Sequence, residues 1–378
     1  MSMDKIQMVD LHGQYMNIRS EIDAAIKNVI DSTAFINGPQ VARFQKNLES
    51  FLGVRHAVTC GNGTDALQIA LMALGLEPGD EVITSPFTFI ATVEAISLLR
   101  LKPVFVDVCP RCFNIDATAI EQAITGKTRV ILPVHLYGQC ANMDAIMHLA
   151  EKHKLWVVED AAQALGSEYA FAGGSVKKAG TIGHIGCTSF FPSKNLGCFG
   201  DGGAMFTNIP GWGEKLKSIT LHGSRVKYYH EMTGVNSRLD TLQAAVLDVK
   251  LKYLPQYNRR RAAAAEYYDN ALKGIHQVQL PKRMKQSTHI FHTYTLKVPA
   301  TDRDPLRDFL QSRGIPTMVY YPVPMHLQKA YSSYGYREGD FPVSEELCGS
   351  VVSIPMHTEL QEKQLEHICN AIDEFFNR

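Results

Sequence analysis

Lys194 stands in a segment that would not suit an ordinary surface lysine. The residues around it, from 188 to 197, are mostly hydroxyl-bearing, aromatic or glycine residues, and none of them is charged. Burial against aromatic walls disfavours the ammonium form of lysine, so the amine becomes a better nucleophile and base at neutral pH. The segment predicts Schiff-base chemistry at Lys194. The alternative is a lysine whose stem packs on aromatic rings while its head stays in water.

A turn between a predicted strand and a predicted helix offers a place for a phosphate. It has the sequence CGNGTD at 60–65 and leads into a helix predicted over 66–74. Free backbone N–H groups at the start of a helix bind anions. The glycine spacing also fits a dinucleotide fingerprint, but Asp80 and Glu81 come at the beginning of the next strand, where that fingerprint requires an acid at its end. We therefore expect one phosphate group and no dinucleotide.

Two more side chains extend this set. Asp160 follows the apolar run 155–158, and a buried carboxylate needs a cationic partner such as a protonated pyridine nitrogen; capping of the next helix is the alternative. Phe89 follows another strand and could stack on a ring or belong to the core. A phosphate cradle, a stacking aromatic, a carboxylate and a lysine together describe a site for pyridoxal 5'-phosphate.

These residues need a sheet to bring them together. Short apolar runs alternate with helical patterns such as 15–30 and 41–52, and the runs lie at 57–59, 81–84, 103–108, 130–135 and 155–158. This alternation predicts an α/β fold, in which a mostly parallel sheet has helices on both faces and its site at the carboxyl ends of the strands.

The pattern changes near residue 238. A long helical segment over 239–249 is broken at Pro255 and resumes over 262–272, and we expect it to connect two domains. Arg259–Arg261 should form a solvated helix face. The later segments predict a small α+β domain: 289–298, a helix opened by Asp304-Pro305 and stopped at Gly314, 317–321, and a helix over 361–376. We expect a large domain over 1–250 and a small one over 251–378.

Composition excludes some partners. The chain has 378 residues, in which 38 Lys and Arg balance 38 Asp and Glu. A net charge of zero argues against nucleic acid or an acidic membrane as partner, but it does not exclude a local basic pocket for a phosphorylated ligand. No apolar stretch is long enough to span a bilayer and no signal sequence is evident, so we expect a cytoplasmic protein without a membrane partner.

The eight cysteines are scattered along the chain, as expected for reduced thiols. Cys109 and Cys112 have the spacing of a redox or zinc motif. No second pair or nearby histidine pair completes a metal site, so we expect no metal and interpret 109–112 as a turn.

Seven ordered motifs make the chain resemble the DegT/DnrJ/EryC1/StrS family of sugar aminotransferases, from about Met8 to near the C-terminus. They are NGTDAL at 62–67, FTFIAT at 87–92, PVHLYGQ at 133–139, EDAAQ at 159–163, SFFPSK at 189–194, GDGG at 200–203 and GVNSRLD at 234–240. The resemblance implies the aspartate-aminotransferase fold (fold type I), with a three-layer α/β/α large domain and a smaller α+β C-terminal domain. It also implies pyridoxal 5'-phosphate as cofactor, with pyridoxamine phosphate as its aminated form.

Roles follow from the resemblance position by position. Lys194 and Asp160 would be catalytic, with Lys194 bonded to the cofactor aldehyde and Asp160 paired with the ring nitrogen. Gln163 would contact the ring hydroxyl and Phe89 the ring face. Gly63, Thr64 and Ser189 would hold the phosphate, with Asn236 supplied by a second subunit, which implies a homodimer with shared sites. The implied substrate-binding residues are His135, Arg225, Lys227, Arg238, Tyr320, Tyr321 and His326.

The resemblance also suggests a reaction. L-glutamate would give its amino group to the keto carbon of a nucleotide-linked sugar. The best match is UDP-2-acetamido-2-deoxy-3-keto-glucuronate, used for bacterial surface polysaccharide. A 3- or 4-keto-6-deoxyhexose on dTDP or UDP is the alternative, and a catalytically silent sensor or interaction protein is an alternative of another class. A sugar 3-dehydratase would have histidine in place of Lys194.

Two positions depart from the family pattern. His184 stands where many members have an acid, and Asp201 stands where glutamate is commoner. We expect neither to touch the chemistry.

Overall fold

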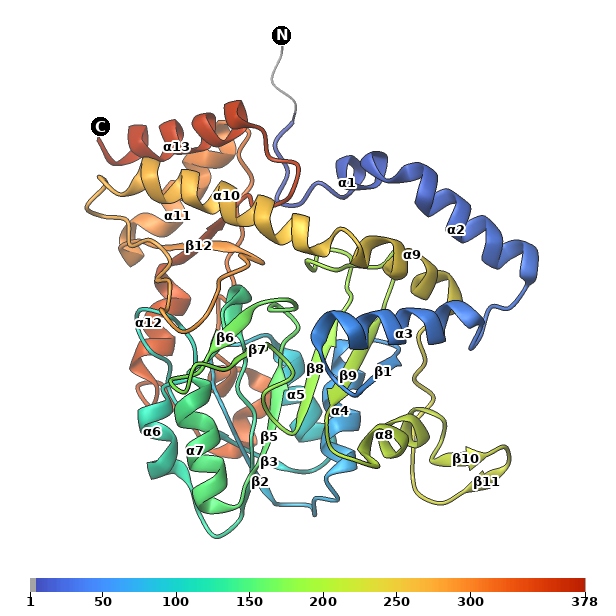
Figure 1. The fold of residues 1–378 in the computed structure, drawn as a ribbon. Helices are drawn as coiled ribbons and strands as arrows, with labels where there is room; N and C mark the ends of the chain where they lie inside the picture. Colours follow the sequence, from blue (N-terminus) through green and yellow to red (C-terminus); the bar gives the residue numbers. More distant parts are fainter. Residues whose placement is uncertain (1–4, 378) are drawn as a thin grey trace.

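The computed structural model describes residues 5–377, and its centre is a seven-stranded sheet (Figure 1). The strand order is β1-β9-β8-β5-β4-β2-β3, and β9 alone runs antiparallel to its two neighbours. The strands are β1 His56–Cys60, β2 Glu81–Thr84, β3 Lys102–Phe105, β4 Thr128–Ile131, β5 Trp156–Asp160, β8 Ile185–Ser189 and β9 Gly203–Thr207. The predicted mostly parallel sheet of an α/β fold is confirmed.

Helices cover both faces of the sheet, as alternation of side chains along the strands requires. Val82 and Val158 join a core with α4 and α5, whereas the adjacent Ile83 and Val157 join a core with α7. The helices of this part of the chain are α1 Leu11–Asn17, α2 Arg19–Ser32, α3 Pro39–Leu52, α4 Gly63–Ala73, α5 Ile90–Leu98, α6 Ala117–Ala123, α7 Met143–His153, α8 Trp212–Thr220 and α9 Thr241–Leu251.

The last third of the chain builds a separate core. Its elements are α10 Leu254–Leu272, β12 Tyr294–Lys297, α11 Ala300–Ser312, α12 Pro342–Ser350, β13 Val351–Ile354 and α13 Glu362–Phe376, and β12 pairs antiparallel with β13. Ile6, from the other end of the chain, packs into the same core. The division at residue 250 stays a prediction, and the first described residues lie with the C-terminal part.

Two hairpins that we did not predict lie outside the central sheet. One consists of β6 Glu168–Ala170 and β7 Val176–Lys178, and the other of β10 Ser224–Val226 and β11 Tyr229–His230. The β10–β11 hairpin extends away from the sheet, at the lower right of Figure 1. Among the helices within 5–377, we find none that combines the length and the apolar character needed to cross a membrane.

Prolines explain two differences from the predicted helices. Pro255 lies in the first turn of α10, where the N–H that proline lacks would have no partner within the helix. The helix therefore continues through Pro255, whereas the sequence predicted an interruption after it. Pro305 lies inside α11, which begins at Ala300, five residues earlier. Proline is therefore a weaker boundary signal here than we expected.

The prediction of a solvated face over 259–261 is wrong for Arg261, which is only 2% exposed. Its Nη1 donates to the backbone carbonyls of Phe291 and His292 at 3.1 Å and to that of Met356 at 2.9 Å. Burial lowers the pKa of Arg261 to about 10, so the guanidinium still carries its charge at neutral pH. It joins α10 to two loops that end beside β12 and β13.

Replacement of Arg261 by methionine should lower the free energy of unfolding by about 3 kcal/mol, because three buried carbonyls lose their charged donor. Urea denaturation followed by near-UV circular dichroism measures this change. Arg259, two residues earlier on the exposed face of α10, is the matched control, and Arg259→Met should change stability by less than about 0.5 kcal/mol. Equal effects of the two substitutions would contradict the anchoring role of Arg261.

Candidate active site

A cavity of about 800 Å³ opens beside the carboxyl ends of β5 and β8. Nine of the residues that the sequence predicted for the site line it: Gly63, Thr64, Phe89, Asp160, Gln163, Ser189, Lys194, Tyr320 and Tyr321. They come from five separate segments of the chain. The central sheet brings four of these segments together, since the ends of its parallel strands meet at one edge, and Tyr320 and Tyr321 come from the C-terminal part of the chain.

Lys194 lies in a turn that follows β8, and its backbone N–H donates to the carbonyl of Phe191 at 2.8 Å. Burial lowers the pKa of Lys194 to about 8, and the negative charge of Asp160 acts in the opposite direction. A measurable fraction of the amine is therefore neutral near pH 7 to 8, as a nucleophile or base requires.

Two polar side chains, those of Asn195 and Lys250, hold the turn that contains Lys194. The amide of Asn195 donates to the side chain of Asn258 at 2.8 Å and to the carbonyl of Ile290 at 3.2 Å. Lys250, which is 2% exposed, donates from Nζ to the carbonyl of Gly197 at 2.6 Å. Burial lowers the pKa of Lys250 to about 8 as well. The segment directly after the reactive lysine is therefore fixed at two points, Asn195 and Gly197.

Asp160 ends β5, and its carboxylate is fixed by two donors. The hydroxyl of Thr92 donates to Oδ2 at 2.8 Å, and the backbone N–H of Ala162 donates to Oδ1 at 3.2 Å. Thr88 and Thr92 share a hydrogen bond of 3.0 Å. The carboxylate is 7% exposed, borders the cavity and has lone pairs to spare, so it can accept a further hydrogen bond from a cation in the cavity.

The start of α4 provides a cradle for an anion. The side chain of Asn62 accepts from the backbone N–H of Asp65 at 2.8 Å, and among residues 5–377 we find no partner for the N–H groups of Gly63 and Thr64. A Cβ on Gly63 would lie 2.6 Å from the Cβ of Ser189, so only glycine lets β8 approach the helix this closely. Free amides and hydroxyls at a helix N-terminus suit a phosphate.

Aromatic side chains form another part of the cavity wall. Phe89 is 55% exposed, and its ring centroid lies 6.1 Å from that of Tyr321. The side-chain amide of Gln163 donates to the Tyr321 hydroxyl at 2.9 Å and accepts from the backbone N–H of Tyr137 at 2.6 Å. Burial raises the pKa of Tyr321, so its hydroxyl keeps its proton. A planar ring could lie against Phe89, with Gln163 at its edge.

His135 does not reach the cavity. It is fully buried, its Nδ1 accepts from the backbone N–H of Ala141 at 3.1 Å, and its Nε2 is 2.8 Å from Glu159. Because Nδ1 accepts a hydrogen bond, the proton of the neutral ring is on Nε2 and points to the Glu159 carboxylate. Both ring nitrogens of the predicted substrate-binding residue are therefore engaged within the chain.

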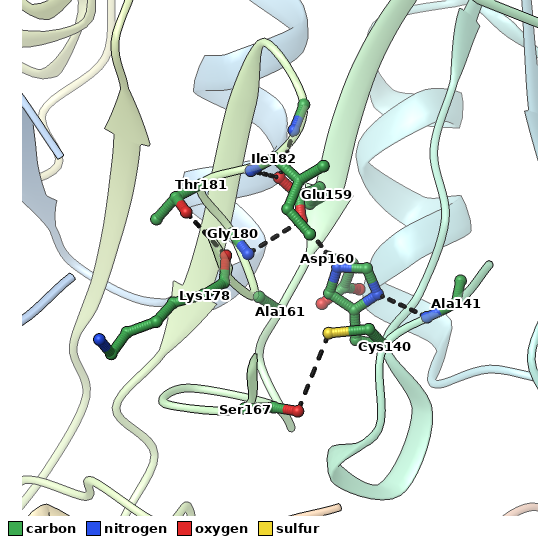
Figure 2. A network of polar contacts seen from close by, with 12 residues as sticks. Cys140, Ala141, Glu159, Asp160, Ala161, Ser167, Lys178, Gly180, Thr181 and Ile182 are labelled. Atoms are coloured by element: carbon green, nitrogen blue, oxygen red, sulfur yellow. Dashed lines mark hydrogen bonds and ion pairs between the residues drawn. The ribbon is translucent and has the colours of Figure 1, made fainter. Parts of the chain in front are cut away.

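Glu159 is the centre of a buried network (Figure 2). Its carboxylate also accepts from the backbone N–H groups of Gly180 at 2.9 Å, Ile182 at 2.7 Å and Gly183 at 2.6 Å. Glu159 and Asp160 are adjacent in β5, so they point to opposite faces of the sheet. One carboxylate fixes the loop before β8, while the other borders the cavity.

Five other predicted residues also lie outside the lining of this cavity. His326 is buried because its ring packs against Phe105 and Phe341, and its Nε2 lies 2.9 Å from Glu345 of α12. The other four belong to the β10–β11 hairpin or to the segment after it: Arg225, Lys227, Asn236 and Arg238. Asn236 is exposed, whereas its neighbour Ser237 donates to Asp65 at 2.6 Å.

Sequence reasoning missed several residues of the cavity wall, among them Tyr137, His292 and Asp201. The His292 N–H donates to the carbonyl of Tyr137 at 2.8 Å. Burial, with the positive charge of Lys194, keeps the pKa of His292 well below its usual value, so the imidazole is neutral. Asp201 borders the cavity although we expected it to lie away from the chemistry. Tyr137 belongs to the PVHLYGQ motif, which could have indicated it.

The residues present fit pyridoxal 5'-phosphate. One cavity holds an anion cradle at Gly63 and Thr64, a carboxylate for a pyridinium nitrogen at Asp160, an aromatic face at Phe89 and an amine of lowered pKa at Lys194. Each functional group of the cofactor finds its chemical complement, and no metal is needed.

Comparison with known proteins agrees with this geometry. The family model described as the DegT/DnrJ/EryC1/StrS aminotransferase family matches residues 16–373. A "Pleiotropic regulatory protein" of Geobacillus stearothermophilus is 44% identical over 373 residues, 98% of each chain. The "UDP-2-acetamido-2-deoxy-3-oxo-D-glucuronate aminotransferase" of Pseudomonas aeruginosa is 41% identical over 367 residues, 97% of this chain and 99% of the relative.

Among solved structures, the fold is similar to that of S. venezuelae DesV, determined "in complex with ketimine intermediate". The TM-score is 0.96, the identity is 40%, and each chain is covered completely. The three proteins match over the whole length of the chain, so the similarity includes both the central sheet and the C-terminal core.

In cofactor-free protein, the Lys194 amine should react with an amine-directed reagent with a half-maximal rate near pH 8, because burial lowers its pKa to about 8. Competitive labelling with acetic anhydride at a series of pH values, followed by peptide mass mapping, measures the titration. The exposed Lys27, labelled in the same samples, is the internal control. Coincident titrations of the two lysines would contradict the desolvation of Lys194.

Proposed function

This chain belongs to the DegT/DnrJ/EryC1/StrS family and is a sugar aminotransferase that uses pyridoxal 5'-phosphate; we propose that it moves the amino group of L-glutamate to the C3 keto carbon of UDP-2-acetamido-2-deoxy-3-keto-glucuronate. The observation that carries the proposal is that Lys194 and Asp160 border the same cavity as the anion cradle of α4. The sugar product would serve surface polysaccharide synthesis in the bacterial cytoplasm.

The cofactor, when bound, supplies an aldehyde that carries the amino group and a ring that takes up electrons. Gly63, Thr64 and Ser189 would hold its phosphate, and Phe89 would lie against its ring. Asp160, fixed in position by its bonds from Thr92 and Ala162, would accept a hydrogen bond from the ring nitrogen and favour its protonated form.

Lys194 moves the proton in this proposal. Its Nζ takes the α-proton of the amino donor and releases it again within the same cavity, which needs an amine that is neutral in part of the molecules at neutral pH. The turn around Lys194 is fixed by Asn195 and Lys250, so the amine keeps its position through both half-reactions. The neutral imidazole of His292 adds no positive charge beside it.

We propose that the site is completed by a second copy of the chain. Asn236 is exposed and does not border the cavity of its own chain, and Arg225 and Lys227 lie on the exposed β10–β11 hairpin. A nucleotide diphosphate and a uronate both need cations. Arg225 pairs with Glu231 at 3.5 Å and Lys227 lies over the Tyr228 ring, but these partners are on or next to the same exposed hairpin, so the two cations would be presented to the cavity of a neighbour. A keto-6-deoxyhexose on dTDP or UDP, the alternative substrate, has no carboxylate and would need fewer cations.

A catalytically silent regulatory protein is the second candidate, because the relative at 44% identity bears the name of a regulatory protein. A silent protein has no need of a desolvated lysine beside a fixed carboxylate. Lys194 and Asp160 therefore favour catalysis, and turnover with glutamate separates the two candidates.

Purified protein with pyridoxal 5'-phosphate should convert UDP-2-acetamido-2-deoxy-3-keto-glucuronate and L-glutamate to the amino sugar and 2-oxoglutarate. Mass spectrometry measures the formation of both products. Under the same conditions, dTDP- and UDP-keto-6-deoxyhexoses should react at least about 100-fold more slowly, because their sugars lack the carboxylate that the cations would bind. Lys194→Ala should reduce turnover by at least about 10³-fold, because the base is lost. A faster reaction with a keto-6-deoxyhexose would favour the alternative substrate, and no reaction with any keto sugar would favour the silent protein.

Shared sites can be tested by mixing two inactive variants. Lys194→Ala retains Asn236, and Asn236→Asp retains Lys194 while placing a negative charge near the phosphate. After subunit exchange, about a quarter of wild-type activity should return, since half of the dimers would carry one intact site. Lys194→Ala mixed with Asp160→Ala is the control, because no site in that mixture contains both residues. If the first mixture recovers no more activity than this control, a site that uses Asn236 of the second subunit is excluded.

A further inference from the structure

Cys109 and Cys112 lie close together in a turn between β3 and α6, away from the cavity. The turn is closed by the backbone N–H of Phe113, which donates to the carbonyl of Cys109 at 2.9 Å, in the spacing of one helical turn. The side chains of Cys109 and Cys112 interact with each other within this turn. Both cysteines are partly exposed, whereas the other six cysteines of the chain are buried. This pair is therefore accessible as well as close.

The turn is held rigidly from two sides. Cys109 donates its N–H to the carbonyl of Asn114 at 2.9 Å, and the Asn114 side chain accepts from the N–H of Leu136 at 3.0 Å. Before the turn, Asp107 accepts from the backbone N–H groups of Val343 and Ser344, both at 2.9 Å, at the start of α12. The two thiols are kept next to each other by the fold.

The two thiols differ in acidity. The Cys112 thiol donates to the Cys109 sulfur, the backbone N–H groups of Cys112 and Arg111 also face it, and the pKa of Cys109 is lowered to about 5. The same contact, with burial, raises the pKa of Cys112. Cys109 is therefore a thiolate at neutral pH, and the neighbouring thiol keeps its proton.

We propose that Cys109 and Cys112 form a redox-active dithiol that is oxidised reversibly by small-molecule disulfides such as oxidised glutathione. The Cys109 thiolate attacks one sulfur of the disulfide and releases the first small thiol. Cys112 then gives its proton to solvent and attacks the Cys109 sulfur, which releases the second small thiol. One small disulfide is reduced to two thiols and the two cysteines are oxidised to one disulfide. This differs from our expectation that 109–112 is only a turn.

Peptide mapping of the intact protein with its cofactor tests the proposal. The protein is treated with oxidised glutathione at pH 7, quenched with acid, alkylated after unfolding and cut with trypsin. Trypsin cleaves after Arg111, so the fragments 101–111 and 112–127 stay joined only if the disulfide has formed, and dithiothreitol should separate them. The six buried cysteines should carry the alkyl group and serve as internal controls. Failure of the two fragments to join, in protein that retains its cofactor absorbance, would overturn the proposal.

Two variants separate the roles of the thiols. Cys112→Ser should accumulate a glutathione adduct on Cys109, because the second attack is missing. Cys109→Ser should react at least about 10-fold more slowly, because the acidic thiol is lost and the remaining thiol of Cys112 is partly buried. In the unsubstituted protein, iodoacetamide should modify Cys109 at pH 6 before any other cysteine. Equal alkylation of Cys109 and of the buried cysteines at pH 6 would also overturn the assignment.

Discussion

The desolvation of one amine is the condition on which the site depends. Lys194 has its pKa lowered by burial, and Asp160, which must stay charged, raises it again. The two requirements conflict, because a nearby anion favours the ammonium form. The structure moderates this conflict by giving the carboxylate its own donors, Thr92 and Ala162, so that part of its charge is balanced away from the lysine. The resulting pKa of about 8 lets both protonation states of Lys194 be populated.

The alternation of side chains along β5 allows two buried carboxylates to stand next to each other in sequence. Glu159 accepts hydrogen bonds from His135 and from the loop at 180–183, and Asp160 borders the cavity. An anion in the interior must be fully paired, and the Glu159 network satisfies this with three backbone N–H groups. It thereby fixes the segment that leads into β8 and onward to Lys194. A structural carboxylate thus supports the position of a chemical one.

Local sequence predicted the parts of the site that follow strands. Lys194, Asp160, Phe89 and Gly63 lie at the ends of strands or shortly after them, and the α/β alternation alone brings those strand ends to one edge. The partners of buried polar side chains could not be predicted in this way. Nothing near Arg261 in the sequence distinguishes it from the exposed Arg259, since its acceptors are 30, 31 and 95 residues away. His135 and His326 have their partners 24 and 19 residues away, which tertiary packing alone decides.

The absence of a net charge is compatible with an anionic substrate because the cations are distributed unevenly. Within the cavity of a single chain, Lys194 is the only lysine or arginine that the described residues contribute to the lining, and its charge is weakened by burial. Arg225 and Lys227 lie instead on a hairpin that extends away from the sheet. A diphosphate in the cavity of an isolated chain would therefore lack counter-charges, and a desolvated anion without them is costly. This imbalance is the physical reason to expect that a neighbouring chain completes the substrate site.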